Sequence, residues 1–216
     1  MKLFPSSKWA RVRLAILLGL LLYILSFATY GYFQYNKKEG DLIFQSLPFG
    51  ELTTVIEGAT NSPYSHVGLV IYKNGFWYVR EAIGKVRDTH LLWWILRGRG
   101  DTFSVYRLKE AYKQNIPKLI EESQKMLGYP YDFHYRLDDT KIYCSELIYK
   151  AYKRVTNKEL GKITTLEELN WKPYKDFILS IENTIPLDRK MITPKDLSEA
   201  DELELVFSNY ERVNIK

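Results

Sequence analysis

The pattern of apolar and polar positions separates an N-terminal apolar stretch from a longer part in which the two kinds alternate. Residues Leu14 to Phe33 form a run of 20 residues without a charged side chain, about the length of a helix that spans a bilayer. Tyr30, Tyr32 and Phe33 gather toward its far end, as aromatic residues do at a membrane interface. We therefore expect a transmembrane helix or signal-anchor over residues 14–33.

The basic residues around this run predict its orientation. Four of them lie in residues 1–13 and two follow the run at Lys37 and Lys38, so the excess of positive charge favours a cytoplasmic N-terminus. The remainder, residues 39–216, is then expected outside the cytoplasm, in the periplasm or the extracellular space, on a single-pass membrane protein. The alternative is a signal peptide cleaved near Ser26-Phe27-Ala28, which would secrete the same part.

Beyond residue 38 the alternation predicts one globular domain. Expected strands cover residues 41–45, 66–73, 76–83 and 102–108, and Asn74-Gly75 between two apolar runs is typical of a two-residue hairpin loop. Expected helices cover residues 116–127 and 144–155, and the tail is expected to add a helix near 174–181 and a strand near 202–207. Strands that precede helices in this way predict an α+β fold with an antiparallel sheet.

The net charge of +5 belongs to the N-terminus and not to the domain. Residues 1–38 carry six basic residues and no acidic one, which leaves 25 basic against 26 acidic residues in the rest of the chain. A domain with this balance has no basic footprint for phosphates, so we expect no nucleic-acid partner.

A single cysteine, Cys144, stands at the start of an expected helix. It excludes an internal disulfide framework, and the wide separation of His66, His90 and His134 offers no metal-binding spacing, so we expect neither metal nor other cofactor. Cys144 begins the apolar face of its helix, which is typical of a buried structural cysteine. The same position suits a nucleophile, because a helix N-terminus stabilises a thiolate and its N–H groups can hold an oxyanion.

The expected hairpin places a base and a carboxylate near each other. With a two-residue loop at Asn74-Gly75, Gly68 lies opposite Glu81, and Glu81 is the diagonal neighbour of His66 on one sheet face. A largely apolar strand face should bury Glu81, and a buried carboxylate requires a partner. A three-residue loop would instead turn Glu81 to the opposite face.

Several short motifs, in this order, resemble a known family. E-G-D-L-I-F, Y-S-H-V-G-L-V-I-Y and W-Y-V-R-E-A-I-G are similar to the Gly-Asp and His-Val-Gly strands of NlpC-type cysteine peptidases, and G-Y-P-Y-D-F followed by Y-C-S-E-L-I-Y is similar to their nucleophile segment. Here the histidine precedes the cysteine, as in the circularly permuted, YiiX-like group of papain-fold hydrolases. The resemblance runs from about Gly40 to Tyr152.

This resemblance implies a permuted papain-like fold and a role for each matching residue. Cys144 would be the nucleophile, His66 the general base and Glu81 the residue that orients the imidazole. Tyr131 and Ser145 would serve the oxyanion site, Ser145 through the N–H groups at the helix start. Related peptidases often use His or Asn in the orienting position, so the assignment of Glu81 depends on the hairpin register.

The leading prediction is therefore an exported, membrane-tethered cysteine hydrolase that cleaves amide bonds through an acyl-enzyme, with cell-wall peptides among its candidate substrates. The alternative is a lipid acyl hydrolase, acyltransferase or thioesterase of the same superfamily. The expected substrate is accordingly a peptide or another acyl-bearing molecule. Exposure of Trp93 and Trp94 would favour a lipid substrate, and their burial would indicate a structural helix. A binding module without turnover is the third possibility.

Overall fold

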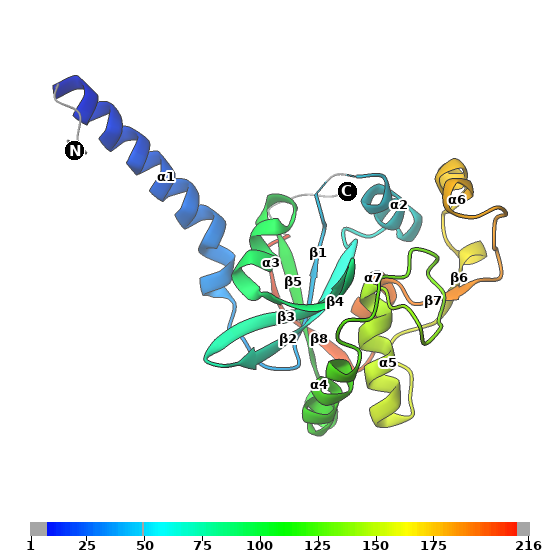
Figure 1. Cartoon of the computed structure of the whole chain (residues 1–216). Helices are drawn as coiled ribbons and strands as arrows, with labels where there is room; N and C mark the ends of the chain where they lie inside the picture. Colours follow the sequence, from blue (N-terminus) through cyan, green and yellow to red (C-terminus); the bar gives the residue numbers. More distant parts are fainter. Residues whose placement is uncertain (1–7, 49, 211–216) are drawn as a thin grey trace.

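A six-stranded antiparallel sheet, with the strand order β4-β3-β2-β1-β5-β8, forms the centre of the protein (Figure 1). The computed structural model describes residues 8–48 and 50–210. The strands are β1 (Leu42–Gln45), β2 (His66–Lys73), β3 (Phe76–Ile83), β4 (Lys85–His90), β5 (Phe103–Leu108) and β8 (Leu203–Ser208). This arrangement agrees with the predicted α+β fold and antiparallel sheet; β4 was not predicted.

The β2–β3 hairpin has the predicted register. Asn74 and Gly75 both have positive φ, of 53° and 84°, as the favoured two-residue hairpin turn requires. Lys73 pairs with Phe76 and Leu69 with Arg80. The side-chain alternation that brings His66 and Glu81 toward each other is therefore present.

Helices cover the two faces of the sheet unequally. On one face α4 (Ile116–Lys125), α5 (Cys144–Thr156) and α7 (Pro194–Ser198) pack with buried side chains such as Phe44 and Leu69 into the larger core. On the other face α3 (Leu91–Arg97) packs on Ile43 and Val79, together with Tyr35. Each large apolar side chain buried in this way contributes roughly 1.5–3 kcal/mol relative to an exposed one.

The remaining elements form a smaller layer beside α5. They comprise α2 (Glu51–Thr60), the two-stranded sheet of β6 (Thr164–Thr165) and β7 (Lys190–Met191), α6 (Lys175–Ile181), and 3-10 turns at Leu166–Glu168 and Lys172–Tyr174. Two further 3-10 turns lie elsewhere: Arg99–Asp101 packs against α3, and Glu110–Asn115 packs against α4. The α6 segment closes on α2, where the Asn170 N–H donates to the Ala59 carbonyl at 2.9 Å. Gly58 permits this approach, because a Cβ there would lie 1.6 Å from the Tyr174 hydroxyl oxygen. Sequence patterns did not predict α2.

The N-terminal apolar run forms helix α1 (Lys8–Gln34), which projects away from the sheet and joins it at its C-terminal end (Figure 1). Among the residues that the structure describes, no helix is long and apolar enough to cross a membrane. The predicted transmembrane helix or signal-anchor over residues 14–33, and with it the predicted single-pass membrane location, is therefore wrong. The C-terminal end of the predicted segment packs on the domain, since a Cβ on Gly31 would lie 2.8 Å from the Phe103 ring. Tyr35, which follows both the segment and the helix, is buried in the same core as Phe103.

Candidate active site

Cys144 is the first residue of α5 and a free thiol, with only 2% of its surface exposed. The helix start is fixed on both sides: the Tyr143 N–H donates to Glu146 at 3.2 Å, and the Tyr143 hydroxyl accepts from the Ile192 N–H at 3.0 Å. The first N–H groups of a helix have no partner within it. Cys144 is thus both buried, as a structural cysteine would be, and placed where a thiolate and an oxyanion are stabilised.

His66 begins β2 and contacts both Cys144 and Glu81. Its Nε2 lies 2.6 Å from Glu81 Oε2, and Cys144 lies close enough to the imidazole to raise its pKa. Because Nε2 contacts the Glu81 carboxylate, Nδ1 is the ring nitrogen that can face the Cys144 thiol. The imidazole also stacks on the Trp94 ring, with 5.9 Å between the centroids. The structure therefore brings together all three residues of the predicted triad.

Glu81 accepts hydrogen bonds from four side chains and is fully buried. Its Oε2 accepts from Trp94 Nε1 at 2.9 Å and from Arg97 at 2.5 Å, in addition to His66. Its Oε1 accepts from Thr89 Oγ1 at 2.6 Å and from Arg97 at 3.0 Å. A carboxylate held by this many donors cannot rotate, so the imidazole that it contacts is fixed as well.

These contacts shift the protonation of the pair toward its charged form. Burial acts to raise the pKa of Glu81, but the hydrogen bonds and charges of His66 and Arg97 outweigh it and hold that pKa well below the usual range. Burial acts to lower the pKa of His66, but Cys144 and Glu81 outweigh it and raise that pKa to about 9. At neutral pH the imidazole is therefore protonated.

The two predicted oxyanion residues, Tyr131 and Ser145, have different hydrogen-bond partners. The Tyr131 hydroxyl is 3.1 Å from the Tyr135 hydroxyl. Burial, followed by the neighbouring Tyr135 and Cys144, holds the pKa of Tyr131 well above its usual value, so this hydroxyl stays a donor. Ser145 is buried, and its hydroxyl donates to the Ile192 carbonyl at 2.7 Å. Its side chain is thus committed to the fold, and only its N–H can serve an oxyanion.

Sequence patterns missed three of the groups that hold Glu81: Thr89, Trp94 and Arg97. The tandem tryptophans were noted for a different reason, and the structure separates them: Trp93 is 67% exposed, whereas Trp94 is fully buried. A Cβ on Gly68 would lie 2.2 Å from Val79 Cγ1. The space beside Gly68 is therefore filled, and only glycine lets the two strands approach here.

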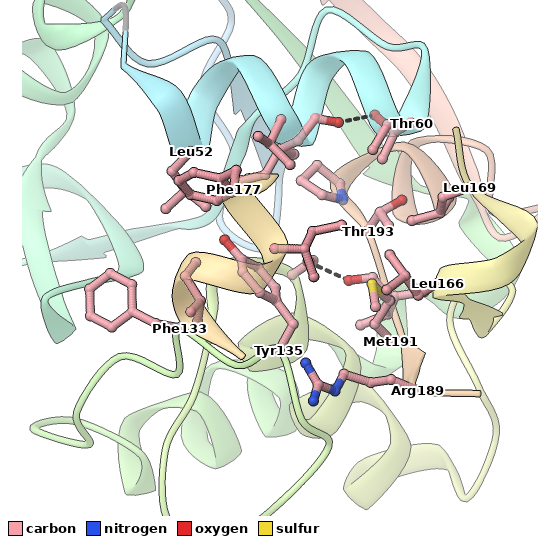
Figure 2. A pocket seen from close by; sticks show the side chains of 18 of the residues that line it. Leu52, Thr60, Phe133, Tyr135, Leu166, Leu169, Phe177, Arg189, Met191 and Thr193 are labelled. Carbon is pink, nitrogen blue, oxygen red and sulfur yellow. Dashed lines mark hydrogen bonds between the residues drawn. The ribbon is translucent and has the colours of Figure 1, made fainter. Parts of the chain in front are cut away.

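Two hollows lie beside the triad and share Leu52, Ile56 and Phe133 as lining residues. A hollow on the His66 side is lined by both His66 and Tyr131, and also by Gly84. A second, mostly apolar cavity is lined by Cys144 and Ser145 and contains about 800 Å³ of empty space, with the open solvent at its mouth included (Figure 2). Binding cavities for small molecules commonly have this apolar character.

Comparisons with known proteins agree with this geometry. The model of the C92 family, permuted papain-like amidase enzymes of the YaeF/YiiX type, matches residues 36–207. The uncharacterized protein YiiX of Escherichia coli strain K12 is 30% identical over 195 residues, which cover 88% of this chain and 93% of YiiX.

A solved structure is similar as well. The crystal structure of YiiX from Escherichia coli O157:H7, described as a metalloprotein, superposes with a TM-score of 0.73 at 29% identity and covers 81% of this chain and 98% of that one. In this chain, the described residues bring no three His, Cys, Asp or Glu side chains together in a group that could hold a metal ion. The extent of the family match and the likeness to YiiX show that the chain is a cysteine hydrolase that belongs to the C92 family of permuted papain-like amidases.

Proposed function

We propose that the protein hydrolyses amide bonds through a triad in which Cys144 is the nucleophile, His66 the general base and acid, and Glu81 the orienting carboxylate. The observation that carries this proposal is the continuous contact from Cys144 through His66 to Glu81, with 2.6 Å between the imidazole and the carboxylate. A nucleophile, a base within reach and a third group that fixes the base are the requirements of covalent catalysis.

In the first half of the reaction, His66 already holds the proton of the Cys144–His66 pair, and the sulfur adds to the amide carbonyl carbon. The N–H groups at the start of α5 and the Tyr131 hydroxyl are placed to donate to the oxyanion that forms. The C–N bond then breaks, its electron pair stays on nitrogen, and His66 gives the proton to the leaving amine. A thioester on Cys144 remains.

In the second half, His66 takes a proton from water and the resulting hydroxide adds to the thioester carbonyl. The C–S bond breaks, the acid leaves, and the proton stays on His66, which restores the starting pair. Throughout, Glu81 stabilises the imidazolium and holds the ring with Nε2 toward itself, because Trp94 and Arg97 fix the carboxylate in turn.

The proposal is tested with peptidyl and acyl amides of 7-amino-4-methylcoumarin, whose hydrolysis releases a fluorescent amine. We expect the wild type to release the amine and to show, by mass spectrometry of the quenched reaction, one acyl group bound at Cys144. Cys144→Ala should lose both signals while its circular dichroism spectrum stays unchanged. Full activity in Cys144→Ala, or turnover with the acyl group attached to another residue, would overturn the proposal.

A further inference from the structure

The backbone of Tyr135 has a conformation that large side chains rarely adopt. Its φ is 52°, in the left-handed region, which a bulky residue enters when the surrounding structure holds it there. Within residues 8–48 and 50–210, the other non-glycine residues with positive φ are all of types that tolerate it: Asn61, Asn74, Asp101 and Asn157. Because strain of this kind is concentrated at functional sites, the side chain that it places requires an explanation.

A buried carboxylate, that of Asp132, holds the turn around Tyr135. Its Oδ1 accepts from the His134 N–H at 3.0 Å, and its Oδ2 accepts from the Arg136 N–H at 2.6 Å. The Asp132 N–H in turn donates to the Ile142 carbonyl at 3.4 Å, in the segment that leads into α5. The strained turn is therefore fixed from within and is also attached to the start of the nucleophile helix.

This turn places the Tyr135 side chain between the oxyanion site and the nucleophile helix. Its hydroxyl lies 3.1 Å from the Tyr131 hydroxyl, and its ring packs on that of Tyr143 with 5.0 Å between the centroids. Tyr131 lines the hollow on the His66 side, whereas Tyr135 lines the cavity that contains Cys144, and Figure 2 shows its ring pointing into that cavity. The two hydroxyls thus form a pair that reaches from one hollow to the other.

Both hydroxyls of this pair keep their protons. Burial raises the pKa of each, and the nearby Cys144 adds to the rise in both Tyr131 and Tyr135. The effect of Cys144 on each of them also shows that the pair lies within electrostatic reach of the sulfur.

The number of protons in the pair decides which hydroxyl donates to which during the reaction. A hydroxyl has one proton to donate and two lone pairs that accept. Once Tyr131 donates its proton to the oxyanion, its hydrogen bond with Tyr135 persists only if Tyr135 is the donor. Donation to the Tyr131 oxygen polarises that hydroxyl and strengthens the bond that it makes to the oxyanion.

We infer that Tyr135 is a positioning residue of the oxyanion site, whose hydroxyl donates to the Tyr131 oxygen and so directs the Tyr131 proton toward the oxyanion. The inference rests on the proposed function, in which Tyr131 donates to that oxyanion. Both tyrosines remain protonated throughout, and no bond to either is made or broken. The strained backbone holds the Tyr135 hydroxyl against Tyr131 before a substrate binds, so the donor is already oriented when charge develops.

The test compares Tyr131→Phe, Tyr135→Phe and the double variant, each in the full chain, with the acyl amides of 7-amino-4-methylcoumarin. Tyr135→Phe should lower kcat about three- to tenfold and leave KM unchanged, since a hydrogen bond that matters in the transition state is lost. Tyr131→Phe should lower kcat by about 10²-fold, as loss of an oxyanion donor does. In the double variant the second substitution should add no further loss, because Tyr135 then has no Tyr131 hydroxyl to direct.

Two further measurements separate positioning from a structural role. Tyr149→Phe is the matched control, since Tyr149 is a buried tyrosine of α5 whose hydroxyl donates to Glu159 at 2.8 Å; it should keep the kcat of the wild type. Alkylation of Cys144 by iodoacetamide forms no oxyanion. Tyr135→Phe should therefore be alkylated at the rate of the wild type while its hydrolysis is slowed.

The outcomes distinguish failure of this inference from failure of the proposed function. If alkylation slows as much as hydrolysis in Tyr135→Phe, then Tyr135 supports the placement of Cys144, and the inference is overturned while the triad stands. An unchanged kcat in Tyr135→Phe, or losses that multiply in full in the double variant, would overturn it as well. Absence of hydrolysis and of any acyl adduct in the wild type would overturn the proposed function, and the inference with it.

Discussion

The two sides of Cys144 differ in how they use polar groups. On the His66 side, Glu81 accepts hydrogen bonds from four side chains, which include a buried Trp94 and an Arg97 ion pair of 2.5 Å. On the cavity side, Thr60, Ser145 and Thr193 donate hydrogen bonds to other groups of the protein, and the surface that a ligand would meet is mostly apolar. The first arrangement fixes the geometry of the triad, and the second leaves space without imposing hydrogen bonds.

This difference indicates a division of roles between parts of the fold. The groups that hold Glu81 come from the hairpin, β4 and α3, all packed on the main sheet, so they share the rigidity of the sheet. The cavity walls come from α2 and the segment around α6, which meet each other through contacts such as that of Gly58 with Tyr174. Substitutions on the first side should therefore affect turnover, and those on the second should affect the choice of substrate.

The largest effect is expected from Glu81→Gln. The amide keeps the shape of the side chain but loses the charge that stabilises the imidazolium, and we expect kcat to fall by about 10²- to 10⁴-fold. Asp88→Asn is the control, since Asp88 also forms a buried ion pair, with Arg80 at 2.8 Å, but does not contact His66. Equal losses of activity in the two variants would show that Glu81 only stabilises the fold and does not orient His66.

The next effect is expected from Gly68→Ala, which tests the close approach of β2 and β3. The new Cβ would lie 2.2 Å from Val79 Cγ1 and 3.0 Å from the Arg80 carbonyl oxygen, and overpacking of this kind costs about 1–3 kcal/mol. Urea denaturation measures this loss in the free energy of unfolding. Gly19→Ala, where a Cβ meets nothing within 4 Å, is the control. A stability equal to that of the wild type would contradict the packing described for the hairpin.

A smaller and graded effect is expected from pH. The pKa of His66 is raised to about 9 by Cys144 and Glu81, against the opposing effect of burial, so activity should fall about tenfold per unit above that pH as the proton for the leaving amine is lost. The kcat/KM profile of the folded enzyme measures this limb. Constant activity to pH 11 would contradict the protonated imidazole.

The same shifts predict how stability depends on pH. Because the pKa of His66 is raised from 6.5, the stabilisation it provides is complete below pH 6.5 and is lost as pH rises through about 9. Because the pKa of Glu81 is lowered from 4.5, its contribution is present above pH 4.5 and is lost as pH falls further. The free energy of unfolding, measured by urea at each pH, should therefore decline in both directions from a range between these limits.

The smallest effect is expected from Trp94→Phe, which keeps a ring beneath His66 but removes the N–H that donates to Glu81. We expect kcat to fall about three- to tenfold with KM unchanged, and the alkaline limb of the pH profile to move, because one of several donors to the carboxylate is lost. Trp93→Phe is the control, since Trp93 is 67% exposed. If kcat and the alkaline limb of the pH profile both stay as in the wild type, Trp94 contributes only to packing, and its N–H has no role in the triad.

The sequence predicted those parts of the site that depend on local structure. The Asn74-Gly75 turn determines the hairpin register, and the register alone makes Glu81 the neighbour of His66. The start of α5 at Cys144 follows from the apolar spacing of that helix. Both features arise within short stretches of chain, where periodicity and turn chemistry are reliable guides.

Features made by distant stretches could not be predicted in the same way. Trp94 and Arg97 reach Glu81 because α3 folds back over the sheet, and no local pattern encodes that path. The wall of the cavity depends on the contact between Gly58 and Tyr174, far apart in the sequence. The transmembrane prediction over residues 14–33 had the same limit, since hydropathy does not show that Gly31 packs against Phe103 of the domain.

The most direct test of the account is the rate at which iodoacetamide alkylates Cys144, the only cysteine in the chain, in the wild type and in His66→Ala at pH 6 to 7. His90→Gln serves as the control for loss of a histidine outside the triad. A thiolate paired with the His66 imidazolium predicts rapid labelling of the wild type and of His90→Gln, with a loss of at least tenfold in His66→Ala. An unreactive Cys144, or equal rates in all three proteins, would contradict the activated thiol on which the proposed function depends.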